Sequence, residues 1–478
     1  MTFIRTRFAP SPTGFMHVGG VRTALFAYLI ARQAPDGKFI LRLEDTDQKR
    51  EVVGSAEHLM KALKALGIIY DEGPDIGGPY APYRQSERLD TYKKWGQKLI
   101  DKGRAYADPY TTEQLDEFHE QAKAEKKAFL YRHHRPVESP IWDGTMPLRF
   151  KSDPKNYSWH DEVMGDLSTG PEVIDDIILI KSDGYPTYNF AHIVDDAEMD
   201  ISHIIRGQEF IASQPNYLNI YEALEIEHPL FATMPHILNK EGNKKLGKRD
   251  GAKDVLEYLD EGYLAEAMIN FIASMGWNDG TEQEVFTKDE LIAKFSLSRV
   301  QHSGARFDEQ RLLWMNGQWI RKLSVDELFN RVANFWPESA KTVGDEFKKQ
   351  VLGLVQDRLK TLADLPIMTS YFFTEPTPDI TMIQTNKQLG NLTSDEIKSL
   401  LDSAKQTLDG SQYDTISLQN TLNKLLETTG QKPGILFSLI RLAVSWAPFS
   451  PALNDTLAAI GHDKVQSRLQ SAIDTISK

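Results

Sequence analysis

Hydrophobic positions follow two different periods near the start of the chain. The apolar and β-branched run from Phe3 to Phe8 is typical of a buried strand, which must end where two prolines and a glycine follow. Residues 38–44 have the pattern of a second strand. Between the two strands, apolar residues recur at the spacing of one buried helical face, at Val21, Ala24, Leu25, Tyr28 and Leu29. The pattern predicts a strand, a helix and a second strand that pairs in parallel with the first.

The connection from the first strand to the helix, residues 7–22, has the composition of a phosphate-binding corner. It places His17, Gly19 and Gly20 at the start of the helix. Free amides and the positive end of the helix dipole point out of such a terminus, glycines let a ligand approach the backbone, and an imidazole can donate to a phosphate oxygen. An ordinary strand-turn-helix corner is the competing interpretation, because glycine and proline are common in turns.

Charged residues follow the predicted strands at the edge where parallel sheets bind ligands. Glu44 ends the second strand and could receive an ammonium group, or else cap the next helix. Arg206 follows a later predicted strand and could clamp a carboxylate, together with the aromatic Tyr188. Structural pairing of Arg206 with Asp195 or Asp196 is the alternative.

The pattern changes in the middle of the sheet, which predicts an inserted domain at residues 85–185. The sheet is predicted to resume with strand-like residues at 185–196 and 201–205. Within the insertion, a basic and aromatic cluster contains Arg132 and Arg135. These arginines could contact an RNA backbone, and a solvated protein surface is the competing interpretation.

A loop with four cations follows, Lys-Lys-Leu-Gly-Lys-Arg-Asp-Gly at residues 244–251, here called the lysine loop. Lys245 and Lys248 could neutralise charge on a leaving pyrophosphate, and the glycines would let the loop close over it. Contact with nucleic acid is the alternative role. From there to the end the spacing is helical, and a Pro- and Thr-rich break at 373–391 predicts two helical subdomains.

Composition narrows the class of protein. The 478 residues exceed the roughly 250 to 300 at which single cores stop growing, so we expect several domains. The absence of cysteine excludes disulfides, thiolate catalysis and cysteine-held zinc. The net charge of −13 argues against a general nucleic-acid coat, although it allows one basic face. No window predicts a membrane span or a signal peptide, so we expect a cytoplasmic protein.

In this order the motifs resemble those of the bacterial-type glutamyl-tRNA synthetases, which are class I aminoacyl-tRNA synthetases. The motifs that carry the resemblance are His-Val-Gly-Gly at 17–20, Arg-Leu-Glu-Asp-Thr-Asp at 42–47, Gly-Tyr-Pro-Thr-Tyr-Asn-Phe-Ala at 184–191, Val-Asp-Asp at 194–196, Arg-Gly-Gln-Glu at 206–209 and the lysine loop. The match is dense over the first two thirds of the chain and sparse over the last third.

The resemblance implies an α/β Rossmann-type catalytic domain with an α+β insertion, followed by all-α C-terminal domains. The implied regions are the two catalytic halves at 1–84 and 186–240, an acceptor-end-binding insertion at 85–185, a helical tRNA stem-contact domain at 241–322 that carries the lysine loop, and an all-α anticodon-binding region at 323–478. The last region would divide at 373–391.

By the same resemblance, the chain activates glutamate with ATP and transfers it to the 3′ end of tRNA(Glu). Positioning and electrostatic stabilisation can accelerate both steps without a protein nucleophile. The residues implied at the ATP site are Pro10, His17, Gly19, Gly20, Glu209, Leu238, Lys245 and Lys248, of which His17, Lys245 and Lys248 are the catalytic set. The residues implied at the glutamate site are Arg7, Ser11, Glu44, Tyr188 and Arg206.

ATP would arrive with Mg²⁺ as its counter-ion, and no metal ligand from the protein is expected. Some relatives hold zinc in the insertion, but Asp108, Tyr110 and Arg135 occupy the cysteine places here, so we expect no structural zinc. Gly247 replaces the usual serine of the lysine loop, and His192 stands where a small residue is usual. The expected partners are glutamate, ATP and tRNA(Glu), and we expect a monomer.

Two alternatives remain open from the sequence. An enzyme of relaxed specificity would also charge tRNA(Gln). A catalytically impaired tRNA-binding relative is motivated by Gly247, because the missing serine hydroxyl could have bonded a phosphate. A relative that glutamylates a tRNA base and a generic adenylyltransferase are disfavoured by the long helical region after Ser324.

Overall fold

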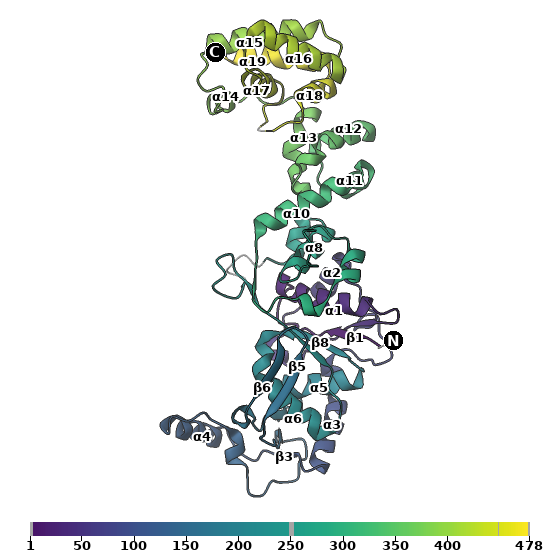
Figure 1. Cartoon of the computed structure of the whole chain (residues 1–478), viewed down its shortest axis with the longest axis vertical. Helices are drawn as coiled ribbons and strands as arrows, with labels where there is room; N and C mark the ends of the chain where they lie inside the picture. Colours follow the sequence, from purple (N-terminus) through teal and green to yellow (C-terminus); the bar gives the residue numbers. More distant parts are fainter. Residues whose placement is uncertain (1–2, 248–252, 448, 477–478) are drawn as a thin grey trace. The chain divides into compact units, whose positions relative to one another are not determined.

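The computed structural model describes residues 3–247, 253–447 and 449–476. The chain forms two compact units, one of Met1–Leu259 with Ala265–Glu309 and one of Asp260–Leu264 with Gln310–Lys478 (Figure 1). Lys248, which the sequence predicts to be catalytic, lies outside the described residues.

The first unit is built on a six-stranded sheet in the order β2-β1-β8-β9-β5-β6. The strands are β1 (Arg5–Phe8), β2 (Lys38–Leu41), β5 (Tyr157–Asp161), β6 (Gly165–Thr169), β8 (His203–Gly207) and β9 (Leu230–Met234). Neighbours pair in parallel, except β5 and β6, which form an antiparallel hairpin. The chain leaves β1 toward β2 on one side while β8 lies on the other, so the strand order reverses between β1 and β8.

Helices cover both faces of this sheet. Successive side chains of a strand point to opposite faces, and all four side chains of β1 are buried, so both faces must be covered. In β1 the hydroxyl of Thr6 donates to the carbonyl of Ala27 in α1, whereas Arg7 reaches Asp196 in α5. Helix α1 is buried along most of its length against the sheet, α8 and α9. The helices are α1 (Val18–Arg32), α2 (Ser55–Ala65), α3 (Leu89–Asp101), α4 (Thr112–Ala124), α5 (Tyr188–Glu198), α6 (Gln214–Leu224), α7 (Val255–Asp260), α8 (Ala265–Ser274) and α9 (Lys288–Lys294).

Helix α5 corrects one sequence prediction, since the strand expected at 185–196 was wrong. The segment is rich in aromatic and β-branched residues, which favour strands. A short apolar run buried on several sides cannot be assigned to helix or strand from its period alone. Its burial against α3, α6 and the sheet decides for the helix, and this helix carries Asp195 and Asp196 into the protein interior.

The insertion contains a separate antiparallel sheet in the order β3-β4-β7, made of β3 (Ala105–Ala107), β4 (Leu148–Phe150) and β7 (Ile178–Ile180). Helix α4 begins with a capping box between Thr111 and Gln114. The β5–β6 hairpin also lies within residues 85–185, yet it pairs with β9 and extends the main sheet. The sequence pattern did not predict this extension, because a hairpin carries little signal for the strand with which it will pair.

A short parallel pair, β10 (Ile237–Leu238) and β11 (Ala305–Arg306), follows β9. Leu246 donates its backbone amide to the carbonyl of Ile237 at 2.8 Å, so the beginning of the lysine loop is fixed against β10.

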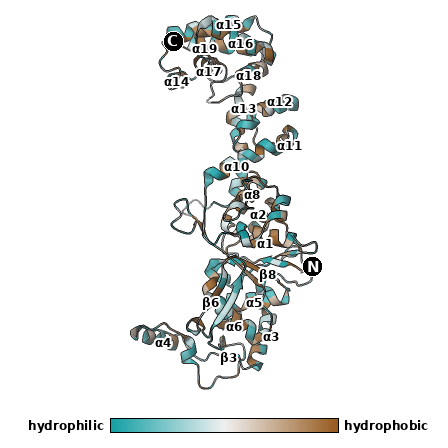
Figure 2. Ribbon diagram, in the orientation of Figure 1, coloured by the Kyte–Doolittle hydropathy of each residue, from teal (hydrophilic) through white to brown (hydrophobic). Residues whose placement is uncertain are grey.

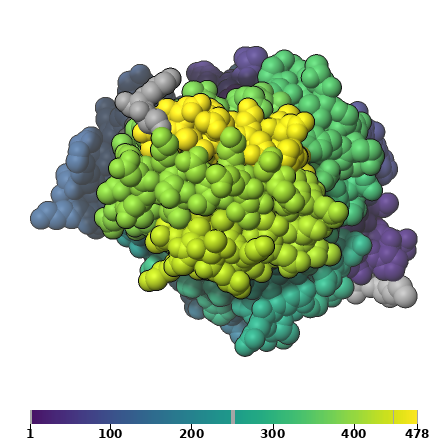
Figure 3. All heavy atoms as spheres, turned by 90° about the horizontal axis from the view of Figure 1, so that it is seen from above, coloured from purple at the N-terminus to yellow at the C-terminus, as the bar shows by residue number. Residues whose placement is uncertain are grey.

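The described part of the second unit is helical and has its own core. Figure 2 shows hydrophobic and hydrophilic residues mixed along its helices, and Figure 3 shows the last helices, in green to yellow, as one packed body. Leucines from several helices meet in the core, among them Leu401, Leu422 and Leu439. The helices are α10 (Glu309–Lys322), α11 (Val325–Arg331), α12 (Asp345–Val355), α13 (Leu365–Phe373), α14 (Thr381–Gln384), α15 (Ser394–Asp409), α16 (Thr415–Thr429), α17 (Pro433–Ser445), α18 (Leu453–Ile460) and α19 (His462–Ile476). Within the described ranges, none of the helices is both long and apolar enough to cross a membrane.

Candidate active site

The candidate site lies beyond the carboxyl ends of β1, β2, β8 and β9, where the strand order reverses. Two cavities open there, with volumes of about 210 and 1080 Å³. Both are lined by His17, Gly20, Thr23, Gly207 and Glu209. Ligands in the two cavities would therefore lie next to each other.

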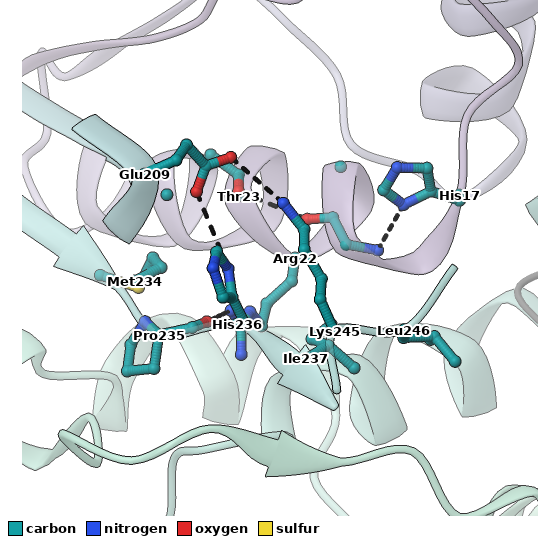
Figure 4. Close-up of a pocket in the computed structure, with 13 residues that line it drawn as sticks. His17, Arg22, Thr23, Glu209, Met234, Pro235, His236, Ile237, Lys245 and Leu246 are labelled. Carbon is teal, nitrogen blue, oxygen red and sulfur yellow. Dashed lines mark hydrogen bonds and ion pairs between the residues drawn. The ribbon is translucent and has the colours of Figure 1, made fainter. Parts of the chain in front are cut away.

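His17 is the N-cap of α1 and lines both cavities, of which Figure 4 shows the smaller. The amide of Gly19 donates to Nδ1 of His17 at 3.1 Å, so in the neutral ring the proton sits on Nε2, which can donate to a ligand. A Cβ at Gly19 would lie 3.0 Å from Cε1 of His17, whereas a Cβ at Gly20 would meet nothing closer than 3.8 Å. Glycine at position 19 thus allows the close approach of the imidazole to the helix end.

The carboxylate of Glu209 contacts both Lys245 and His236 at the smaller cavity. Nζ of Lys245 lies 3.4 Å from Oε1 of Glu209, and Nδ1 of His236 lies 3.8 Å from Oε2 (Figure 4). Burial and the Lys245 cation lower the pKa of His236, although Glu209 opposes this change. A phosphate chain in the cavity would compete with Glu209 for Lys245.

Arg22 is a buried cation at the smaller cavity that the sequence did not single out. Its guanidinium donates to the carbonyls of Met275, at 3.3 Å, and Pro235. Burial lowers the pKa of Arg22 to about 10, although Glu209 opposes this change. An arginine in a helical pattern normally predicts a solvated face, so its position facing the cavity carried no signal in the sequence.

The five residues predicted to hold glutamate all line the larger cavity, namely Arg7, Ser11, Glu44, Tyr188 and Arg206. Arg206 is 6% exposed, and its Nη1 atom has no hydrogen-bond partner among the residues that the structure describes. The guanidinium lies 5.4 Å from the ring centre of Phe210 and 5.1 Å from that of Tyr217. A buried cation with an unsatisfied donor is suited to an incoming carboxylate.

Arg7 and Glu44 belong to a buried charge network. Nε and Nη2 of Arg7 donate to the two carboxylate oxygens of Asp196 at 3.0 and 3.2 Å, so Asp196 pairs with Arg7 and not with Arg206. Arg42 donates to Asp196 at 2.8 Å and to Glu44 at 2.9 Å. Burial raises the pKa of Glu44 to about 7, although Arg42 and Arg7 act in the opposite direction.

Three further positions that the sequence singled out, Pro10, Leu238 and His192, lie at or near the cavities. Pro10 lines the larger cavity, and Leu238 follows the lining residue Ile237 and forms a β-bridge with Lys245. His192 is buried and stacks on Tyr188 with 4.7 Å between ring centres, and its Nδ1 donates to the carbonyl of that tyrosine at 2.7 Å. Burial, together with Arg206, lowers the pKa of His192 to about 3, so the ring is neutral at neutral pH.

The two basic candidates of the insertion bind protein groups. Nη1 of Arg132 donates to the carbonyl of Pro171 at 2.6 Å. Arg135 forms a bidentate pair with Asp176 at 2.6 and 2.7 Å. These contacts favour a structural role for this cluster, and RNA contact by either arginine stays a prediction.

Asp108 and Arg135, two of the positions where the resemblance would place cysteines, form ion pairs. Asp108 accepts from Arg149 at 2.9 and 2.8 Å and from the hydroxyl of Tyr131 at 2.5 Å. Arg149 also donates to the carbonyl of Asp176, which in turn pairs with Arg135. In the described ranges, His, Cys, Asp and Glu side chains form no group of three or more that could hold a metal ion.

Comparisons with known proteins define the class. The family profile "tRNA synthetases class I (E and Q), catalytic domain" matches residues 3–314, and the profile "Anticodon binding domain" matches residues 327–473. The chain therefore belongs to the class I tRNA synthetases of the glutamate and glutamine group. The fold class predicted from the sequence is confirmed by these matches and by the parallel sheet and helical second unit.

The relatives narrow this class further. The chain is 37% identical to the glutamate–tRNA ligase of Clostridium acetobutylicum, with 99% of each chain covered, and 38% identical to that of Clostridium botulinum strain Hall, with 99% and 98% covered. Among solved structures, it is similar to a glutamate tRNA ligase from Elizabethkingia meningosepticum in complex with its amino acid, with a TM-score of 0.88, 33% identity, and 99% and 100% covered. The predicted resemblance to the glutamyl-tRNA synthetases is thereby confirmed.

Proposed function

We propose that this chain is a glutamate–tRNA ligase, which forms glutamyl-adenylate from glutamate and ATP and then transfers the glutamyl group to the 3′ end of tRNA(Glu). The observation that best supports this function is the pair of adjoining cavities. One cavity has a helix N-terminus and a histidine donor for phosphate, and the other contains the unsatisfied guanidinium of Arg206. They meet at His17, so a carboxylate and a phosphate can be brought into contact there.

Charge in and around the larger cavity fits glutamate better than glutamine. Among the buried groups at the proposed glutamate site, four guanidiniums and three carboxylates leave one positive charge when all are ionised, from Arg7, Arg42, Arg88, Arg206, Glu44, Asp195 and Asp196. Glutamate carries two carboxylates and one ammonium, and so neutralises this charge, whereas glutamine does not. A cation left buried without its partner costs about 3–5 kcal/mol.

In the first step, an α-carboxylate oxygen of glutamate attacks the α-phosphorus of ATP, and the bond from that phosphorus to the β-phosphate oxygen breaks. His17 would donate from Nε2 to a phosphate oxygen, and Lys245 would stabilise the pyrophosphate leaving group. Lys248, which lies outside the described residues, is proposed for the same role on the pattern of the lysine loop and on the resemblance. The other proposed ATP contacts are Pro10, Gly19, Gly20, Glu209 and Leu238.

In the second step, a hydroxyl of the terminal ribose of the tRNA attacks the carbonyl carbon of the adenylate and gives up its proton to the departing phosphate or to solvent, and AMP leaves with the electron pair of the broken bond. Mg²⁺ enters as the counter-ion of the ATP substrate. We further propose that the chain acts as a monomer in the cytoplasm and that tRNA(Glu) is its tRNA substrate, with additional charging of tRNA(Gln) as the alternative.

Exchange of pyrophosphate into ATP, measured with glutamate, Mg²⁺ and tRNA present, tests the activation step. We expect exchange that depends on glutamate and is not supported by glutamine. The variant Lys248→Ala should lower the exchange rate much more than it lowers the affinity for tRNA. Equal losses of both quantities would contradict the role proposed for Lys248.

A further inference from the structure

A buried bridge joins the cation and the anion of the proposed glutamate site. Arg7 and Glu44 line the larger cavity, and Asp196 and Arg42 lie behind them without lining it. Asp196 pairs with Arg7, Arg42 pairs with Asp196, and Arg42 also pairs with Glu44, in a continuous chain of contacts between 2.8 and 3.2 Å. The side chains of Arg42 and Asp196 are both fully buried.

We propose that Asp196 and Arg42 are positioning residues for the amino-acid substrate, which hold the guanidinium of Arg7 and the carboxylate of Glu44 in a fixed relation. This inference rests on the proposed function. Because one rigid chain connects the two groups, the spacing between the carboxylate-binding and ammonium-binding ends of the site is set behind the cavity and not by the lining residues themselves.

The geometry at Arg7 supports this role. Asp196 occupies its Nε and one N–H of its Nη2, and Nη1 makes only a 3.4 Å contact with the carbonyl of Ile205. Arginine has five N–H donors in a rigid fork, so the edge formed by Nη1 and Nη2 remains for a ligand. Asp196 therefore decides which edge of Arg7 is presented to a carboxylate.

The geometry at Arg42 fixes the position of the Glu44 carboxylate, at the ammonium-binding end of the site. Its Nη1 and Nη2 atoms bind different carboxylates, those of Asp196 and Glu44, so its planar fork sets the distance between them. Asp195, the neighbour of Asp196 on α5, holds this part of α5 against α3 and the residues that precede α3. It accepts hydrogen bonds from Gln85 at 2.8 Å, Arg88 at 2.7 Å and Tyr92 at 2.9 Å.

The test compares Asp196→Asn with wild type in glutamate-dependent pyrophosphate exchange, with tRNA present. Asparagine keeps the shape but loses one charged acceptor, so we expect KM for glutamate to rise about 10- to 100-fold, the equivalent of a lost charged hydrogen bond. KM for ATP should change less than about twofold, since the phosphate corner does not touch Asp196. The matched control is Asp176→Asn, which alters a fully buried carboxylate paired with Arg135 in the insertion and should leave both KM values unchanged.

Arg42→Lys provides a second variant, in case Asp196→Asn does not fold. Lysine keeps the charge but cannot bind two carboxylates as a planar fork, so the same rise in KM for glutamate is expected. Equal changes in both KM values, or no change in either, would overturn the inference. If wild type itself shows no glutamate-dependent exchange, the proposed function fails, whereas an active wild type with unaffected variants refutes only the positioning role.

Discussion

Nε2 of His58 lies 2.6 Å from Oδ2 of Asp254, and this contact joins α2 to the segment that follows the lysine loop. Asp254 also pairs by its backbone with His17, and its Oδ1 accepts from the amide of Leu256 at 2.9 Å at the start of α7. The ring of Phe15 packs on His58 with 4.6 Å between centres. Asp254 thus links the segment that follows the lysine loop to the phosphate corner and to α2.

Loss of this contact should weaken ATP binding selectively. The variant His58→Leu removes the polar partner of Asp254 and lets the backbone beside His17 shift, so we expect KM for ATP to rise by about threefold to tenfold, the effect of one hydrogen bond. KM for glutamate should stay constant. Pyrophosphate exchange measures both, and His160→Leu, which removes an exposed histidine paired with Asp166, is the control. A rise in KM for glutamate of the same size would contradict this role.

The raised pKa of Glu44 predicts a pH dependence of glutamate binding. With a pKa of about 7, the carboxyl becomes protonated as the pH falls below 7, and the neutral form cannot pair with the substrate ammonium. KM for glutamate should therefore rise below pH 7, approaching about tenfold per pH unit, and level off above it. Glu44→Gln should have a high KM with no such pH dependence. A flat profile for wild type between pH 5.5 and 8.5 would contradict the assignment.

Arg206 should contribute to activity at the expense of stability. Arg206→Gln removes the unsatisfied cation, so kcat/KM for glutamate should fall by about 100-fold or more, while the melting temperature should rise by about 2–4 °C because a buried unpaired charge is lost. Steady-state kinetics and differential scanning calorimetry measure the two effects. Arg132→Gln, in the insertion, serves as the comparison for kinetics. Retained kcat/KM in Arg206→Gln would argue against carboxylate binding at this position.

Sequence patterns could predict part of this site because its lining residues stand at element ends. Glu44 ends one predicted strand, Arg206 follows another, and His17 begins a predicted helix, so topology alone brings them to one edge of the sheet. The residues behind the cavity gave no such signal. Arg42 and Asp196 are charged, and charged side chains are usually exposed, so their burial depends on partners that are distant in the sequence.

In the fold, too, elements set by the local sequence could be predicted, whereas elements set by contacts between distant segments could not. Helix α1 could be predicted because its apolar residues have a clear helical spacing. Helix α5 could not, since its aromatic and β-branched residues favour a strand locally and only its packing against α3 and α6 decides otherwise. The pairing of β5 with β9 is likewise a choice between distant segments.

The insertion should depend on its ion pairs for stability. Arg149→Leu leaves Asp108 buried without its charge partner, so we expect a loss of about 3–5 kcal/mol in local stability. Faster hydrogen exchange of the β3 and β4 amides would report this loss. Lys123→Ala, which removes an exposed pair with Glu120, should have little effect.

The same experiment tests the expectation that no structural zinc is present. If the ion pairs of Asp108 and Asp176 stabilise this part of the insertion without a metal, addition of EDTA to wild type should leave hydrogen exchange in β3 and β4 unchanged. Faster exchange after chelation would show that a metal contributes to the insertion.

The central claim is tested most directly by aminoacylation of separately purified tRNA(Glu) and tRNA(Gln) from the same species as the protein, with ATP, Mg²⁺ and radiolabelled glutamate. We predict that label accumulates on tRNA(Glu) and that tRNA(Gln) remains uncharged. Charging of both tRNAs at similar rates would show that the enzyme has relaxed tRNA specificity. The absence of label on tRNA(Glu) would contradict the assignment as a glutamate–tRNA ligase.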